Sequence, residues 1–190
     1  MNLQEYAQSV AENPSFGGAS FGLNSPCQEM KAVETLNGVD SRVLFLQTYQ
    51  YFDGQKNGAF NLIGEFGVLP LAFCLGVIRD FRGEFGHQES KDCRDERIKD
   101  GFRWRDGWYP FAFDQCDNRF LVMDFDPALQ GTAGQIFLYD GRQTLGDWLA
   151  HDLPTLLDEY HAKLVESKFV EDDLYSGRFA AKIDETDYDC

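Results

Sequence analysis

The sequence is poor in the residues that zinc sites and nucleic-acid sites need. Its three histidines, His87, His151 and His161, show neither H-x-x-x-H spacing nor a cysteine cluster, so a zinc site is not expected. Only 17 residues are Lys or Arg against 32 that are Asp or Glu, which gives a formal net charge of −15. Because phosphate binding requires clustered Lys and Arg, this charge argues against nucleic acid and anionic membranes as direct partners.

Long apolar runs, paired cysteines and nucleotide-binding loops are also missing. No stretch of 18 apolar residues occurs, and the N-terminal MNLQEYAQSVAENPSF has neither a basic start nor an apolar core. A membrane span and a secretory signal are therefore not expected. The five cysteines form no C-x-x-C pair, and neither a Walker loop nor G-x-G-x-x-G is present. We expect free thiols in a cytoplasmic protein, with no metal and no cofactor.

Core-forming and acidic side chains are abundant instead. Hydrophobic residues make up 43% and aromatic residues 15% of the 190 positions, with 17 phenylalanines. A chain of this length and composition is expected to fold as one domain, residues 1–190, that buries about 70% of its unfolded surface. The acidic excess has two explanations that charge alone leaves open, namely solubility or attraction of a basic protein partner.

Four helices are predicted in the N-terminal half. Ser25, Pro26 and Gln28 form a helix start with a capping box, and Asn37-Gly38 ends that helix. Residues 13–26 are a predicted loop; within it GASFG (18–22) matches G-x-S-x-G but lacks the strand and helix of a nucleophile elbow. The other helices are predicted over 3–11, from Asp40 or Ser41 through RVLFLQTYQYF, and within 69–85.

The second half of the chain predicts a small sheet. Apolar runs at 108–113, 119–125 and 135–139 are separated by short polar turns, which predicts an antiparallel meander. Residues 86–106 precede these runs and are polar and charged. They are predicted to form an exposed connection.

An amphipathic helix is predicted after the strands. Its apolar stripe runs from Leu145 to Leu164. Pro154 breaks or kinks this helix, or starts a second helix at Asp152. Residues 166–190 are strongly acidic and are predicted to be peripheral.

Four aspartates near the ends of the predicted strands are the candidates for chemistry. Asp124 and Asp126 are two apart in a strand-like run, so their side chains would share one face about 6.5–7 Å apart. Together with Asp114 or Asp117 they would offer oxygen ligands for Mg²⁺ or Ca²⁺, as in a metal-dependent hydrolase. The other interpretation is that they shape turns, because Asp-Pro and DQCDN are turn compositions and no base or second ligand cluster accompanies them.

Four motifs follow one another along the chain: YQYFDGQKNGAF (49–60), WYPFAFD (108–114), FLVMDFDPALQGTAGQIF (120–137) and TLGDWLAHDL (144–153). With the capped helix before them, they resemble the SUKH superfamily, which includes fungal regulators of cell-wall synthesis and bacterial immunity proteins. The resemblance covers residues 25–157, between an N-terminal helix and loop (1–24) and an acidic C-terminal extension (166–190). Phe52 stands where the family often has histidine, and 86–106 has no counterpart.

The resemblance implies an α+β fold with helices packed on a mainly antiparallel, mixed sheet. It also implies binding rather than catalysis, because the family has no shared catalytic residues to carry over. The positions that match the family motifs are then expected to shape the fold: Asp53, Gln55, Trp108, Pro110, Asp114, Asp124, Asp126, Gly134 and Gln135.

Three functional hypotheses follow. The first is a non-enzymatic bacterial immunity protein that binds and neutralises a cognate toxin domain, such as a basic nuclease, through an acidic surface. The second is an intracellular regulatory module that binds an endogenous protein. The third is the hydrolase that would use Asp114, Asp124 and Asp126. The binding face and the oligomeric state stay open at this stage.

Overall fold

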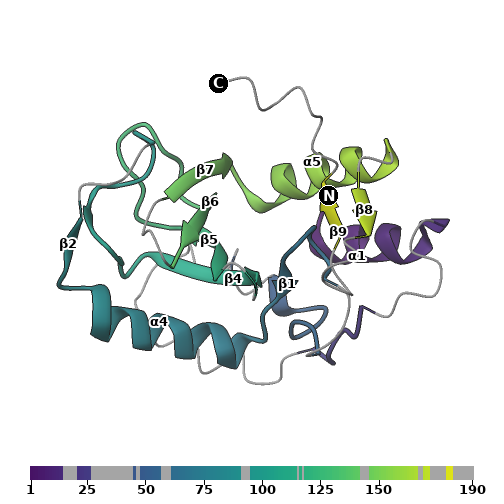
Figure 1. Ribbon diagram of the computed structural model, residues 1–190, viewed down its shortest axis with the longest axis horizontal. Helices are drawn as coiled ribbons and strands as arrows, with labels where there is room; N and C mark the ends of the chain where they lie inside the picture. Colours follow the sequence, from purple (N-terminus) through teal and green to yellow (C-terminus); the bar gives the residue numbers. More distant parts are fainter. Residues whose placement is uncertain are drawn as a thin grey trace.

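A five-stranded sheet forms the centre of the protein (Figure 1). The computed structural model describes residues 1–14, 21–26, 45, 48–56, 61–90, 95–114, 116, 118–141, 146–166, 169–171 and 179–181. The sheet has the order β1-β4-β5-β6-β7, and every pairing within it is antiparallel. Its strands are β1 (Gly67–Val68), β4 (Trp108–Asp114), β5 (Arg119–Asp124), β6 (Gln135–Asp140) and β7 (Gly146–Ala150).

Three helices pack around this sheet in the described part of the chain: α1 (Leu3–Glu12), α4 (Leu71–Phe85) and α5 (Leu153–Val165). Figure 1 shows α4 along one side of the sheet and α1 beside α5 at the end away from β2. Two short hairpins complete the description, β2 (Glu89–Ser90) with β3 (Gly101–Phe102) and β8 (Phe169–Glu171) with β9 (Phe179–Ala181). The α+β class expected from the sequence is confirmed.

The predicted meander is confirmed in β4, β5 and β6. In this register Asp114 lies opposite Arg119, and Trp108 lies opposite Asp124. Strand β5 is apolar on both faces because both faces are covered, and Leu121 and Val122 are fully buried. Pro110 lies where the β4–β5 register shifts, a position that tolerates a residue with no N–H to donate.

The N-termini of α1 and α5 follow the local capping rules. Asn2 caps α1 in a reciprocal capping box with Glu5. Asp152 caps α5 by accepting a hydrogen bond from the Thr155 N–H at 2.8 Å. The two helices contact each other, and Ser9 Oγ and His161 Nε2 form a hydrogen bond of 2.8 Å across them. The predicted helix over 3–11 is confirmed, as is the helix start at Asp152.

The helix predicted to begin at Leu145 was wrong in its first part. Residues Gly146–Ala150 form strand β7, which pairs with β6 and places Trp148 opposite Phe137. A run as short as GDWLA fits either the helical or the strand period. Pairing with the open edge of β6 decides in favour of the strand; Leu145 itself lies outside the described residues.

The predicted exposed connection at 86–106 is exposed only in part. Ile98 is 3% and Trp104 1% exposed. The Trp104 ring meets the rings of Phe81, Trp108 and Tyr139 edge-on, at centroid distances of 5.0, 5.7 and 5.2 Å. Although the segment is polar on average, these two apolar side chains close one end of the core, and edge-to-face packing stabilises the cluster.

Several sequence predictions concern residues that the structure does not describe. The helix from Pro26, Asp117 and most of GASFG lie outside the described ranges. Of the helix predicted through 42–52, Phe45 and residues 48–52 are described. Phe45, Thr48 and Tyr49 are helical and buried, whereas residues 50–52 are not helical, so the predicted helix extended too far. Of 169–190, only the backbones of β8 and β9 are described. In the part of the chain that is described, no helix has the length and apolar character to cross a membrane.

Candidate functional site

The Asp53-Gly54-Gln55 motif holds the start of α4 against the rest of the protein. Asp53 Oδ1 accepts a hydrogen bond of 2.6 Å from the Leu71 N–H, the first N–H of α4. The residue at the helix N-cap is Pro70, which makes no side-chain cap hydrogen bond. Pro70 has no side-chain oxygen to accept a hydrogen bond at the start of α4. Asp53, which lies in a loop distant in sequence, supplies this acceptor instead.

Gly54 is required by the close approach of two backbones. Its φ is +66°, and a Cβ there would lie 2.3 Å from Pro70 N and 2.4 Å from the Leu69 carbonyl carbon. Any other residue would clash with this backbone and would also strain its own left-handed conformation. The glycine thus allows the loop to lie directly against the start of α4.

Gln55 connects three chain segments through one buried amide. Its Nε2 donates to the Phe21 carbonyl at 2.8 Å, and its Oε1 accepts from the N–H groups of Leu62 at 3.1 Å and Val68 at 2.9 Å. The side chain is therefore a hydrogen-bonding bridge, in which one buried amide bonds backbone groups of three segments.

Asp124 and Gln135 shape the connection between β5 and β6. Asp124 Oδ1 accepts from the Asp126 N–H and Oδ2 accepts from Gln135 Nε2, both at 2.9 Å. Gly134, with φ of +90°, donates its N–H to the Asp124 carbonyl at 2.7 Å. Burial raises the pKa of Asp124 to about 6, and the hydrogen bonds from Gln135 and Asp126 oppose this shift. Both carboxylate oxygens are occupied within the turn.

Asp126 is held by two basic side chains. Lys99 Nζ lies 2.6 Å from its Oδ1, and Arg105 Nε lies 3.1 Å from its Oδ2. Burial alone would raise the pKa of Asp126, but the hydrogen bonds from Lys99 and Arg105 outweigh it and hold the pKa below its ordinary value. The carboxylate is ionised and tied to residues of the 86–106 segment.

Asp114 belongs to a separate site at the other end of β5. The fully buried carboxylate accepts from Arg119 Nη2 at 2.7 Å and from the Cys116 N–H at 3.0 Å. Five strand steps of about 3.3 Å separate Arg119, the partner of Asp114, from Asp124, so the two carboxylates lie roughly 17 Å apart. Within the described ranges, no three His, Cys, Asp or Glu side chains gather as a metal site would require. The cluster that the hydrolase hypothesis needs is not formed by Asp114, Asp124 and Asp126.

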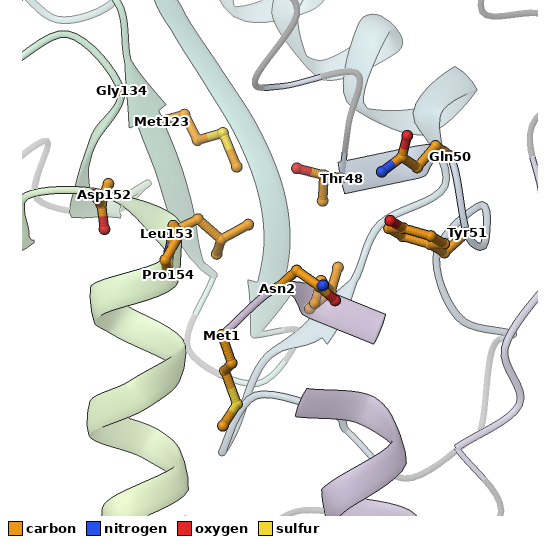
Figure 2. Close-up of a pocket in the computed structure, with 11 residues that line it drawn as sticks. Met1, Asn2, Thr48, Gln50, Tyr51, Met123, Gly134, Asp152, Leu153 and Pro154 are labelled. Atoms are coloured by element: carbon orange, nitrogen blue, oxygen red, sulfur yellow. The ribbon is translucent and has the colours of Figure 1, made fainter. Parts of the chain in front are cut away.

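A cavity of about 150 Å³ opens between the sheet and the N-termini of α1 and α5, and we name it the α1–α5 pocket. Figure 2 shows Met123 and Leu153 directed into this space, with Tyr51 and Asn2 across from them. The residues that line the pocket come from segments far apart in the sequence, so no single sequence motif predicts the pocket. The lining residues are Met1, Asn2, Leu3, Thr48, Gln50, Tyr51, Met123, Gly134, Asp152, Leu153 and Pro154.

The helices that flank this pocket carry exposed carboxylates. Lys163 is the one Lys or Arg within the bounds of α1 and α5. We call this region the acidic surface. Its members are Glu5, Glu12, Asp152, Asp158, Glu159 and Glu166.

The opposite end of the molecule is electrically balanced. Residues 79–106 contain eight of the 17 basic residues and eight of the 32 acidic ones. A groove of about 570 Å³ there contains Arg82 and Arg105. Arg82 pairs with Asp106 at 2.6 Å and Arg105 pairs with Asp126 at 3.1 Å. The net charge of the protein therefore arises outside this segment, and the acidic surface contributes to it.

Comparison with known proteins supports the resemblance seen in the motifs. A search among curated proteins finds no match. The family model of the SMI1/KNR4 family (SUKH-1) matches residues 30–159, which is more than half of the chain. The matched range includes the Asp53-Gly54-Gln55 bridge, the β4–β6 meander and the start of α5. The chain belongs to the SMI1/KNR4 family (SUKH-1).

Proposed function

We propose that this chain is a non-enzymatic immunity protein that binds and neutralises a cognate toxin domain through its acidic surface. Membership of the SUKH-1 family is compatible with an immunity role or with a SMI1/KNR4-like role. The observation that favours the immunity role is the segregation of charge, since 79–106 is balanced while α1, α5 and the two cap residues of α5 expose six carboxylates. The toxin would be a basic domain. A nuclease fits this description because it must present a basic cleft to the phosphates of its nucleic-acid substrate.

The contacts of the buried carboxylates support binding rather than catalysis. Members of the family are generally non-enzymatic. Asp114 is paired with Arg119, and both oxygens of Asp124 are occupied by Asp126 and Gln135. A general base must reach a substrate proton, and these groups are committed to neighbouring protein atoms instead. The residues at the family-matched positions thus stabilise the fold on which α1 and α5 are exposed.

Electrostatic attraction gives the proposal a measurable signature. A basic toxin would be steered toward the acidic surface, so association would be fast and would slow as salt rises. Each exposed charge contact contributes about 0.5 kcal/mol, so removing three should weaken binding about tenfold.

The test compares two triple variants that lose the same charge. Glu12→Gln, Glu159→Gln and Glu166→Gln neutralise the acidic surface, whereas Glu84→Gln, Glu89→Gln and Glu96→Gln neutralise the opposite end. Each tagged protein is used to capture partners from host cells that express the candidate toxin. We expect a basic polypeptide to be retained by the wild type and the second variant and reduced about tenfold with the first. Retention of an endogenous regulatory protein, unaffected by either variant, would contradict the proposal and favour the regulatory role.

A further inference from the structure

The α1–α5 pocket has the size and lining of a site for one apolar side chain. Leu3 and Met123 are 3% and 2% exposed and form its buried part. Tyr51 is 39% exposed and stands at its edge. Its volume is about 150 Å³, and an apolar protein cavity of about that volume is large enough to bind benzene. A single aromatic ring or branched aliphatic group therefore fits.

The charge at the mouth of the pocket favours a cation beside that group. The two helix N-termini contribute a partial positive charge of roughly +0.5 each, and the Met1 amino group adds one more beside Asp158, at 2.8 Å. Against these stand the carboxylates of Asp152, Glu5 and Asp158. The sum of these positive and negative charges is about −1.

The α5 N-terminus is also unsuited to an anion. Thr155 donates its N–H to Asp152 Oδ1 at 2.8 Å. Pro154, which lines the pocket, has no N–H at all. A bound anion would need free backbone N–H groups at this helix end. Here one N–H is bonded to Asp152 and Pro154 has none to offer. Among the described residues that line the pocket, none is a Lys, Arg or His.

We infer that the α1–α5 pocket is the anchor point for a basic partner, which inserts one aromatic or branched aliphatic side chain while a neighbouring lysine or arginine faces Asp152. The inference rests on the proposed function for the identity of the partner. The pocket's preference for an apolar group next to a cation can be measured without any partner. Buried apolar anchors of this kind carry much of the affinity of protein interfaces.

Three small probes separate the contributions of ring and charge. Benzylamine is protonated at neutral pH and carries a ring next to a cation, benzyl alcohol carries the ring alone, and benzoate carries a ring next to an anion. Methyl NMR of labelled methionine reports on the pocket directly, because Met1 and Met123 both line it. We expect benzylamine to shift the Met123 methyl signal saturably, with benzyl alcohol weaker and benzoate at least fivefold weaker than benzylamine.

A matched pair of variants tests the role of Asp152. Asp152→Asn removes the charge and keeps a residue that caps helices equally well, so α5 is expected to remain folded. Asp147→Asn removes an exposed carboxylate of β7 that does not line the pocket. Asp152→Asn should abolish the preference for benzylamine over benzyl alcohol, and Asp147→Asn should leave it intact.

The outcomes distinguish this inference from the proposed function. If no probe gives a saturable shift at Met123, or if benzoate binds as tightly as benzylamine, the pocket is not the anchor, even if toxin capture succeeds. If the benzylamine preference is found but no toxin is captured, the toxin assignment fails while the chemistry of the pocket stands.

Discussion

Replacing Gln55 with alanine is expected to lower the free energy of unfolding by about 3–9 kcal/mol. The change removes three hydrogen bonds, to the Phe21 carbonyl at 2.8 Å and to the N–H groups of Leu62 at 3.1 Å and Val68 at 2.9 Å. A buried polar group that loses its partner costs about 1–3 kcal/mol. The sum is a large part of the ~5–15 kcal/mol that stabilises a typical domain.

The assays are urea unfolding and thermal melting, both followed by tryptophan fluorescence. At this chain length each kcal/mol corresponds to about 2–4 °C in melting temperature, so Gln55→Ala should melt at least about 6 °C lower. Gln8→Ala is the matched control, because Gln8 is exposed on α1 and bonds only Glu12 of the same helix among the hydrogen bonds described. It should cost less than ~0.5 kcal/mol. A loss below ~1 kcal/mol for Gln55→Ala would refute the bridging role assigned to this amide.

Three further predictions follow from the same contacts. Gly54→Ala should prevent stable docking of α4, because its Cβ would lie 2.3 Å from Pro70 N; loss of soluble folded protein checks this, and a native melting curve would contradict it. Asp124 has a pKa raised to about 6 from 3.8, so the stability it contributes is present at acid pH and is lost as pH rises through about 6. The stability of the wild type relative to Asp124→Asn should therefore fall by about 2 kcal/mol between about pH 4 and pH 7, and a flat difference in urea unfolding would contradict this. Arg119→Met removes the cation that pairs with the buried Asp114 and should cost about 3–5 kcal/mol, which calorimetry measures; a cost near zero would mean that the ion pair is not needed.

Three strands of the sheet and the three described helices could be predicted from local signals. Short apolar runs with turn residues between them identified β4, β5 and β6. Apolar spacing predicted α4, and Asp152 followed by Pro154 marked the start of α5. These signals depend on residues that are close together in the sequence, so they can be recognised without knowledge of the fold.

Strand β7 and the burial of Trp104 could not be predicted in this way. Trp148 is fixed by contacts from distant segments, since Arg97 Cζ lies 3.7 Å from its ring centroid and Phe137 pairs with it across the sheet. Trp104 is buried by Phe81, Trp108 and Tyr139, which come from a helix and two strands. In both cases tertiary contacts override the local pattern.

In the candidate site, too, some residues could be predicted from the sequence while their contacts could not. The motif resemblance identified Asp53 and Gln55, but their partners at Leu71, Phe21 and Val68 could be known only from the fold. The α1–α5 pocket joins segments that have no shared spacing in the sequence. The excess of acidic residues was visible from composition, whereas its exposure on α1 and α5 was not.

The most direct test of the central claim is growth of cells that express the captured toxin domain together with each form of this chain. The account predicts that the wild type and the Glu84/Glu89/Glu96 variant restore growth, and that the Glu12/Glu159/Glu166 variant restores it poorly at matched expression. Equal protection by both variants would contradict a role for the acidic surface. Growth inhibition that the wild type fails to relieve would contradict the immunity function itself.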